Sequence, residues 1–171
     1  MSAFTFEKGG VDVTDLVLTP SDFGDTANGL SFWYSDVKTV TNFTTITANI
    51  AFKELTPDGA NTAVDYRLQC VLQGQEDNNE WTDLVSQGSS LFQTEQALNR
   101  RLIVTEGVSD FEPAQEFFQS DALGRPTLGV THEQAPVPDD IRLCIVLGDT
   151  QTTPPNAALT SVKVSATGTL K

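Results

Sequence analysis

The stretch that decides the fold is V-D-Y-R-L-Q-C-V-L-Q-G-Q-E-D-N-N-E-W-T-D-L-V, residues 64–85. In its first half, apolar and polar side chains alternate with a period of two, the pattern of a β-strand with one buried face. The apolar side carries Val64, Tyr66, Leu68, Cys70 and Leu72, and the opposite side carries Asp65, Arg67, Gln69 and Gln73. Residues 75–80 then supply Asn and Asp side chains, which bond nearby backbone and tolerate positive φ. Trp81 restarts the apolar pattern, so the stretch predicts a β-hairpin with an exposed acidic tip and with Trp81 in the core.

Similar alternation recurs at short intervals along the chain. One face of the segment 44–55 carries the apolar side chains Ile46, Ala48, Ile50 and Phe52. Further strands are expected around Phe4 and Phe6 and over residues 11–18, 30–34, 101–105, 141–148 and 158–171. A change of parity within 11–18 predicts a bulge or turn at Thr14-Asp15. About eight strands with Gly, Pro and Asn turns, and no long helix, predict an all-β fold, a β-sandwich of the jelly-roll or Greek-key type with one long irregular segment. The 171 residues are expected to form a single domain.

The strand predicted over residues 141–148, I-R-L-C-I-V-L-G, is apolar on both parities. Such a strand is expected to be covered on both faces or to lie at a subunit contact. Cys144 lies in the middle of this strand and Cys70 in the middle of the strand before the hairpin turn. A small buried hydrophobe is the usual role of a cysteine in that position, and a bridge between the two remains open.

Residues 106–138 show no regular alternation and are rich in Pro and Gly. A stretch of this length inside a compact domain is usually functional or an interaction arm. We therefore expect it to contact a partner, and the first 20 residues are the second candidate arm. The candidate contact residues are Phe111, Phe117, Phe118, Leu123 and Arg125.

The net charge of −13 is the largest compositional deviation. A chain this acidic repels phosphate backbones and anionic membrane surfaces, so direct binding of nucleic acid or membrane is not expected. The longest apolar run, residues 143–147, is far shorter than the ~20 residues that span a bilayer. No secretory signal is visible at the N-terminus, so synthesis in a reducing cytoplasm is expected. The charge either keeps the protein soluble at high concentration or forms an acidic patch that meets a basic partner.

Residues that could carry chemistry are few. His132 is the only histidine, too few for a His-based metal site, and no nucleophile or nucleotide-binding motif is present. The carboxylates mostly stand where turns are expected, although a facing pair for glycoside hydrolysis and calcium binding by acidic loops remain open. Arg100-Arg101 is expected to pair with an acid in the same subunit or in a neighbour. No enzymatic activity and no cofactor are therefore predicted.

The hairpin of residues 65–88, the following R-R-L-I-V-T and the last strand, V-K-V-S-A-T-G-T-L, together resemble the jelly-roll cement, or decoration, proteins on the capsids of tailed bacteriophages. In that family an alternating strand leads through an acidic-polar turn to an aromatic residue followed by Thr and Leu, here Trp81-Thr82-Asp83-Leu84. The resemblance implies a non-enzymatic virion protein, made in the host cytoplasm, that clamps neighbouring copies of the major capsid protein, as a homotrimer on the capsid surface.

The same hairpin, written D-x-x-x-W-T-x-L, also resembles discoidin-type carbohydrate- or lipid-binding modules. That resemblance implies a carbohydrate-binding sandwich of a phage tail or host-surface protein. Such a module needs an exposed aromatic platform, and Trp33-Tyr34 is the adjacent pair that could build one.

Overall fold

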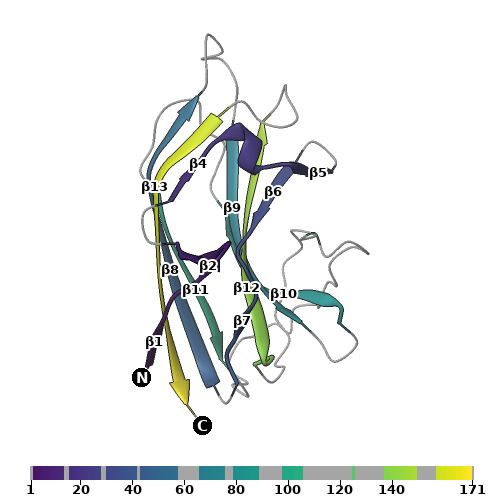
Figure 1. Ribbon diagram of the computed structural model, residues 1–171, viewed down its shortest axis with the longest axis vertical. Coiled ribbons are helices and arrows are strands. Elements are labelled where there is room, and N and C mark those ends of the chain that lie inside the picture. Colours follow the sequence, from purple (N-terminus) through teal and green to yellow (C-terminus); the bar gives the residue numbers. More distant parts are fainter. Residues whose placement is uncertain are drawn as a thin grey trace.

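A computed structural model describes residues 2–13, 16–27, 30–41, 43–57, 66–75, 79–88, 98–105, 125, 137–149 and 157–170. Most of these residues lie in β-strands, which form two facing antiparallel sheets and a separate two-stranded hairpin (Figure 1). A short 3₁₀ turn, Pro20–Asp22, follows the predicted strand end at Pro20. The predicted all-β sandwich is confirmed.

The first sheet has the order β1-β13-β8-β11, with β4 on the same edge as β1. Its strands are β1 (Ser2–Phe4), β4 (Leu16–Leu18), β8 (Phe43–Pro57), β11 (Leu98–Thr105) and β13 (Ala157–Leu170). The second sheet has the order β10-β9-β12-β6-β5, with β7 beside β12 next to the end of β6. Its strands are β5 (Asp25–Ala27), β6 (Leu30–Tyr34), β7 (Lys38–Thr39), β9 (Tyr66–Gln75), β10 (Trp81–Gly88) and β12 (Asp140–Asp149).

The connectivity is that of a jelly roll. The eight principal strands in chain order are β4, β6, β8, β9, β10, β11, β12 and β13. They divide into the sheets β4-β13-β8-β11 and β6-β12-β9-β10, so the chain crosses between sheets at every step except from β9 to β10. This order of two interlocked Greek keys separates the jelly roll from other sandwiches.

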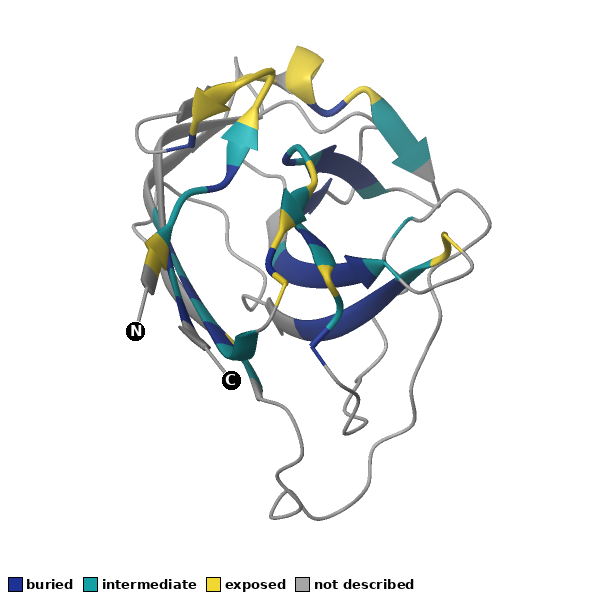
Figure 2. Ribbon diagram, turned by 60° about the horizontal axis from the view of Figure 1, so that its bottom comes forward, coloured by how far each residue is buried: buried dark blue, intermediate teal, exposed yellow. Residues whose placement is uncertain are grey.

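The main core lies between the sheets. Ile46, Ala48 and Ile50 of β8 are buried there, as the alternation predicts, and they belong to one cluster with Cys70 and Leu72 of β9. Figure 2 shows the buried residues along the strands and the exposed ones mainly at the turns. The side chains of Val64, Tyr66, Leu68 and Phe52, the other predicted members of these faces, lie outside the described part.

The N-terminal residues are built into the sandwich. Phe6, Val13 and Leu18 are buried in the main core. Between them, β2 (Glu7–Lys8) and β3 (Val11–Asp12) form a hairpin whose two-residue loop, Gly9-Gly10, has φ values of 60° and 77°. Positive φ at both positions is what such a tight hairpin loop requires, and glycine adopts it without strain. The predicted bulge or turn at Thr14-Asp15 lies outside the described residues.

The central strand β12 is covered on both faces, as its sequence predicts. Its odd-numbered side chains, Ile141 to Leu147, belong to the main core. Cys144 and Val146 point the other way and join Phe32 and Val71 in a second buried cluster. Cys70 and Cys144 are free thiols, because β9 and β12 pair with Cys144 opposite Val71 and the two thiols lie on opposite faces of one sheet.

Candidate functional site

The candidate site lies on the face of the second sheet that is turned away from the first sheet, here called the outer face. Strand pairing places Gln73 of β9 beside Arg142 of β12 and beside Asp83 of β10. On the other side of β12, Tyr34 of β6 pairs with Cys144, one pleat from Arg142. Side chains two residues apart share a face of a strand, so four strands bring these polar groups into one row.

Arg142 is the centre of this row. Its guanidinium carbon lies 4.0 Å from the ring centroid of Trp81 and 4.3 Å from that of Tyr34. Its Nε donates to Gln73 Oε1 at 2.8 Å, and Gln73 Nε2 donates to Asp83 Oδ1 at 2.9 Å. Stacking on aromatic faces and planar hydrogen bonding are the two interactions that distinguish arginine from lysine. The row is therefore specific for an arginine at its centre.

The charges of the row are compensated although most of it is buried. Gln73 and Asp83 are fully buried. Burial lowers the pKa of Arg142 from its ordinary value, but an arginine still remains protonated in a protein. Burial, together with the neighbouring Cys144 and Asp25, raises the pKa of Tyr34 well above 10, so that its hydroxyl stays a proton donor. Within the row, Arg142 and the buried carboxylate of Asp83 are joined through the side chain of Gln73.

Arg125 extends the row at the β5 end. Its Nε and Nη2 donate to Oδ1 of Asp25 at 2.9 and 2.7 Å, and Tyr34 Oη donates to Oδ2 of the same carboxylate at 2.9 Å. Burial alone would raise the pKa of Asp25, but these hydrogen bonds and the charges of Arg125 and Arg142 outweigh it and hold that pKa below its ordinary value. A residue of the predicted contact segment is therefore tied to the outer face of its own chain. Phe111, Phe117, Phe118 and Leu123 lie outside the described residues, as does His132.

An apolar cluster fills the outer face beside the row. Phe32, Val71, Cys144 and Val146 are buried, and Leu30 and Tyr34 pack against them. The rings of Phe32 and Tyr34 stack with centroids 6.4 Å apart and planes 9° apart. Burial raises the pKa of the Cys144 thiol well above its ordinary value. That cysteine is a packing residue, since a reactive one needs a stabilised thiolate.

Two sequence predictions about aromatic residues are wrong. Trp81 lies on the outer face against Arg142 and is only partly buried, because it pairs with Gln75 and shares that residue's face. Trp33 is buried in the main core, whereas Tyr34 points outward, because neighbouring residues of a strand face opposite ways. The two cannot form one exposed platform, and the carbohydrate-binding alternative loses the support that it had from this pair.

Several carboxylates of the described residues accept hydrogen bonds from nearby hydroxyl or backbone groups. Asp22 accepts from Thr19 N and Oγ1 at 2.7 and 2.9 Å and so caps the 3₁₀ turn. Asp140 accepts from Thr39 Oγ1 at 2.7 Å where β7 meets β12. In the described part of the chain, no three His, Cys, Asp or Glu side chains gather closely enough to hold a metal ion. Nor does any helix there have the length and apolar character needed to cross a membrane.

Comparisons with known proteins give no family assignment. No protein-family model, no curated protein and no solved structure matches the chain.

The sequence did contain a signal for the polar row around Arg142 that the predictions above did not use. Arg142 is the single charge inside an apolar strand, and Gln73 occupies the equivalent face of the neighbouring strand. A charge at such a position needs a partner, because an unpaired buried charge is strongly unfavourable.

Proposed function

We propose that the protein is a non-enzymatic structural protein of a bacteriophage virion, which decorates the capsid and stabilises contacts between subunits of the major capsid protein. The observation that carries this proposal is the jelly-roll strand order, β4-β13-β8-β11 facing β6-β12-β9-β10. Double-sheet jelly rolls are a recurrent architecture of viral capsid domains. The order agrees with the fold that the hairpin motif around Trp81 implies by its resemblance to decoration proteins.

The chemistry of the outer face supports a structural role. Arg142, Gln73, Asp83, Tyr34 and Asp25 all hydrogen-bond or stack within the chain, so their polar groups stabilise the sheet. A protein that binds at many equivalent capsid positions must reach a high local concentration without aggregating. The net charge of −13 favours this, because like charge keeps molecules apart in solution.

Binding to capsids tests the proposal directly. Capsids assembled from the major capsid protein alone are mixed with the purified chain and sedimented, and the bound fraction is measured by gel densitometry. We expect saturable binding, a higher temperature of capsid disruption, and no binding to capsids that already carry the protein. Light scattering on the free chain should give about three times the 18.5 kDa chain mass if the trimer that the resemblance implies forms before binding. A monomer that does not sediment with bare capsids would refute the proposal.

A further inference from the structure

Two exposed valines stand out on the surface of the sandwich. Val11 of β3 has a relative exposure of 67% and Val37, just before β7, has 52%. The third large hydrophobic side chain that is exposed among the described residues, Ile103 at 47%, lies on β11 of the first sheet. Scattered single hydrophobic side chains are normal on a protein surface, so the two valines indicate a binding surface only if the fold holds them together.

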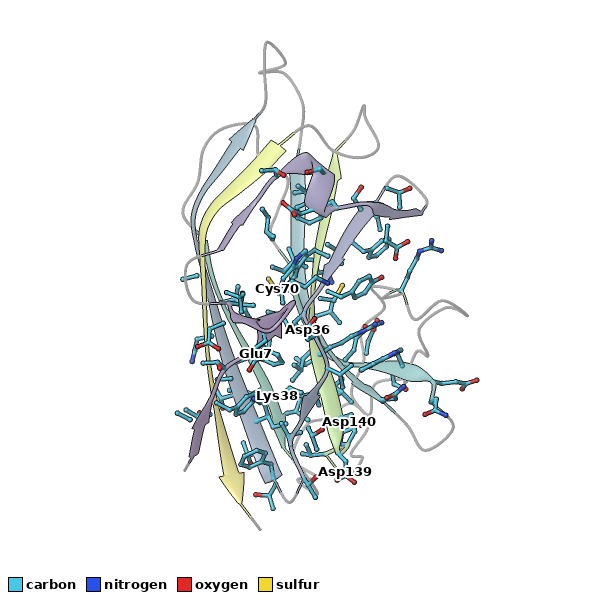
Figure 3. All side chains as sticks on the ribbon, viewed as in Figure 1. Glu7, Asp36, Lys38, Cys70, Asp139 and Asp140 are labelled. Carbon is cyan, nitrogen blue, oxygen red and sulfur yellow. The ribbon has the colours of Figure 1, made fainter. Side chains whose placement is uncertain are left out.

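One hydrogen-bonded frame carries both valines. The backbone N of Gly10, which precedes Val11, donates to Asp36 Oδ2 at 3.1 Å. The backbone N of Asp36, which precedes Val37, donates to the carbonyl oxygen of Glu7 at 2.7 Å. Figure 3 shows Glu7 and Asp36 close together where the hairpin crosses between the two sheets. The hairpin and residues 36–38 therefore form one surface, here called the hairpin surface.

The frame is rigid. The tight Gly9-Gly10 loop closes the hairpin, Val13 N donates to Phe6 O at 2.9 Å, and Thr5 Oγ1 donates to Asp12 Oδ1 at 3.1 Å. A surface that is ordered before binding loses less conformational entropy when a partner docks. The exposed valines are thus presented in a fixed geometry, as the apolar centre of a protein interface requires.

The hairpin surface and the adjoining end of β12 are acidic. Residues 139–140 adjoin β7, since Thr39 pairs with Asp140 and Val40 N donates to the carbonyl oxygen of Asp139 at 2.6 Å (Figure 3). The hairpin surface and this end of β12 together carry five carboxylates and two ammonium groups, which leaves a net charge of −3. The carboxylates belong to Glu7, Asp12, Asp36, Asp139 and Asp140, and the ammonium groups to Lys8 and Lys38.

We propose that the hairpin surface is the face that docks on the capsid subunit, at a basic patch with an apolar centre that receives Val11 and Val37. This inference rests on the proposed function and adds to it the surface of contact and the chemistry of the partner. Apolar contacts at the centre supply affinity, and complementary charges around them steer association and fix orientation. The net charge of −13 was explained above either by solubility or by an acidic patch that meets a basic partner, and here we adopt the second explanation.

The test compares the Val11→Ser/Val37→Ser double variant with Ile103→Ser in the sedimentation assay on bare capsids. All three side chains are exposed, so urea unfolding midpoints should match that of the unmodified chain and exclude a folding defect. We expect the double variant to bind at least tenfold more weakly and Ile103→Ser to bind as the unmodified chain does. The charge arm compares Asp12→Asn/Asp139→Asn with Asp22→Asn, an exposed acid of the 3₁₀ turn Pro20–Asp22, where the asparagine oxygen can still accept the hydrogen bonds from Thr19. The double substitution should weaken binding and reduce the dependence of binding on salt concentration, whereas the control substitution should change neither.

The outcomes separate the two proposals. If the unmodified chain binds bare capsids but the double valine variant binds equally well, the hairpin surface is not the contact and the proposed function stands. The same conclusion follows if Ile103→Ser loses as much affinity as the double variant. If the unmodified chain does not bind, the proposed function fails and this inference fails with it.

Discussion

Arg142→Ala should be among the most damaging single substitutions on the outer face. Arg142 lies between the rings of Trp81 and Tyr34 and donates to Gln73, which in turn donates to the buried carboxylate of Asp83. Alanine removes the stacked guanidinium and its hydrogen bond at once. It also takes away the positive charge that compensates Asp83, whose side chain has no exposed surface.

The expected cost is about 3–5 kcal/mol of unfolding free energy. Each ring contact with a partly desolvated arginine contributes about 0.5–2 kcal/mol, and a hydrogen bond from a charged donor contributes about 1.5–3 kcal/mol. Domains of this kind are stable by only about 5–15 kcal/mol. The variant should therefore unfold at a much lower urea concentration than the unmodified chain.

Urea titration followed by circular dichroism measures this cost, and Arg125→Ala is the matched control. Arg125 also pairs with a carboxylate, but the two side chains are 20% and 33% exposed. Its loss should cost about 1 kcal/mol or less, since water screens a partly exposed pair. A double-mutant cycle between Arg142→Ala and Trp81→Leu should give a coupling energy of about 0.5 kcal/mol or more. The reasoning is refuted if Arg142→Ala costs no more than Arg125→Ala, or if the coupling is absent.

Three further predictions follow from single side chains. Because Asp25 has a lowered pKa in the folded protein, its contribution to stability is complete above its ordinary pKa of 3.8 and is lost as the pH falls through the folded value. Asp25→Asn should therefore reduce the loss of stability at acidic pH, measured by urea unfolding at a series of pH values. An unchanged loss at acidic pH would contradict the assignment. Gly168→Ala should cost about 1–3 kcal/mol in thermal unfolding, because a Cβ there would lie 2.5 Å from ring carbons of Phe43, whereas Gly24→Ala, with its nearest contact at 3.9 Å, should be close to neutral. Ser31→Ala should leave stability unchanged or raise it by about 1 kcal/mol, because the buried hydroxyl has no hydrogen-bond partner among the described residues. A loss of more than about 1 kcal/mol would show that the hydroxyl is satisfied.

The strands could be predicted because their signal is local. Alternation places Ile46, Ala48 and Ile50 on one face whatever the rest of the chain does, and the structure buries all three. The two apolar parities of residues 141–148 likewise indicated a strand covered on both sides. Asn79, in the predicted turn, has a φ of 65°, the left-handed conformation that Asn tolerates better than most residues.

The position of Trp81 could not be predicted because it depends on strand register. Trp81 and Asp83 lie on the outer face, and a register shift between Asp83 and Val85 then returns the strand to the core, where Leu84 and Val85 are both buried. A bulge of this kind reverses the parity within one strand, and no residue type marks it in the sequence. The neighbours of Trp81 in the sequence therefore predict a position in the core, whereas in the fold Trp81 lies on the outer face.

The ion pair of Arg125 with Asp25 could not be predicted from the sequence, for a different reason. The two residues are 100 positions apart, and six of the described strands, β6 to β11, lie between them along the chain. Periodicity reports the face on which a residue lies but not the partner that it meets there. Arg125 was selected from the sequence as a contact residue, and the contact that the structure gives it is within its own chain.

Arg142 also resolves an ambiguity that the hydrophobic pattern of β12 leaves open. A one-residue slip turns every side chain of a strand to the other face, and a strand with polar residues on one parity resists the slip through its pattern alone. In β12 the outward side chains Cys144 and Val146 are themselves apolar and buried, so a slip would exchange one apolar set for another. The guanidinium removes this degeneracy, since the slip would carry it between the sheets, away from Gln73 and both aromatic rings. The polar row on the outer face thus specifies the register of the central strand at the point where hydrophobic burial specifies it least.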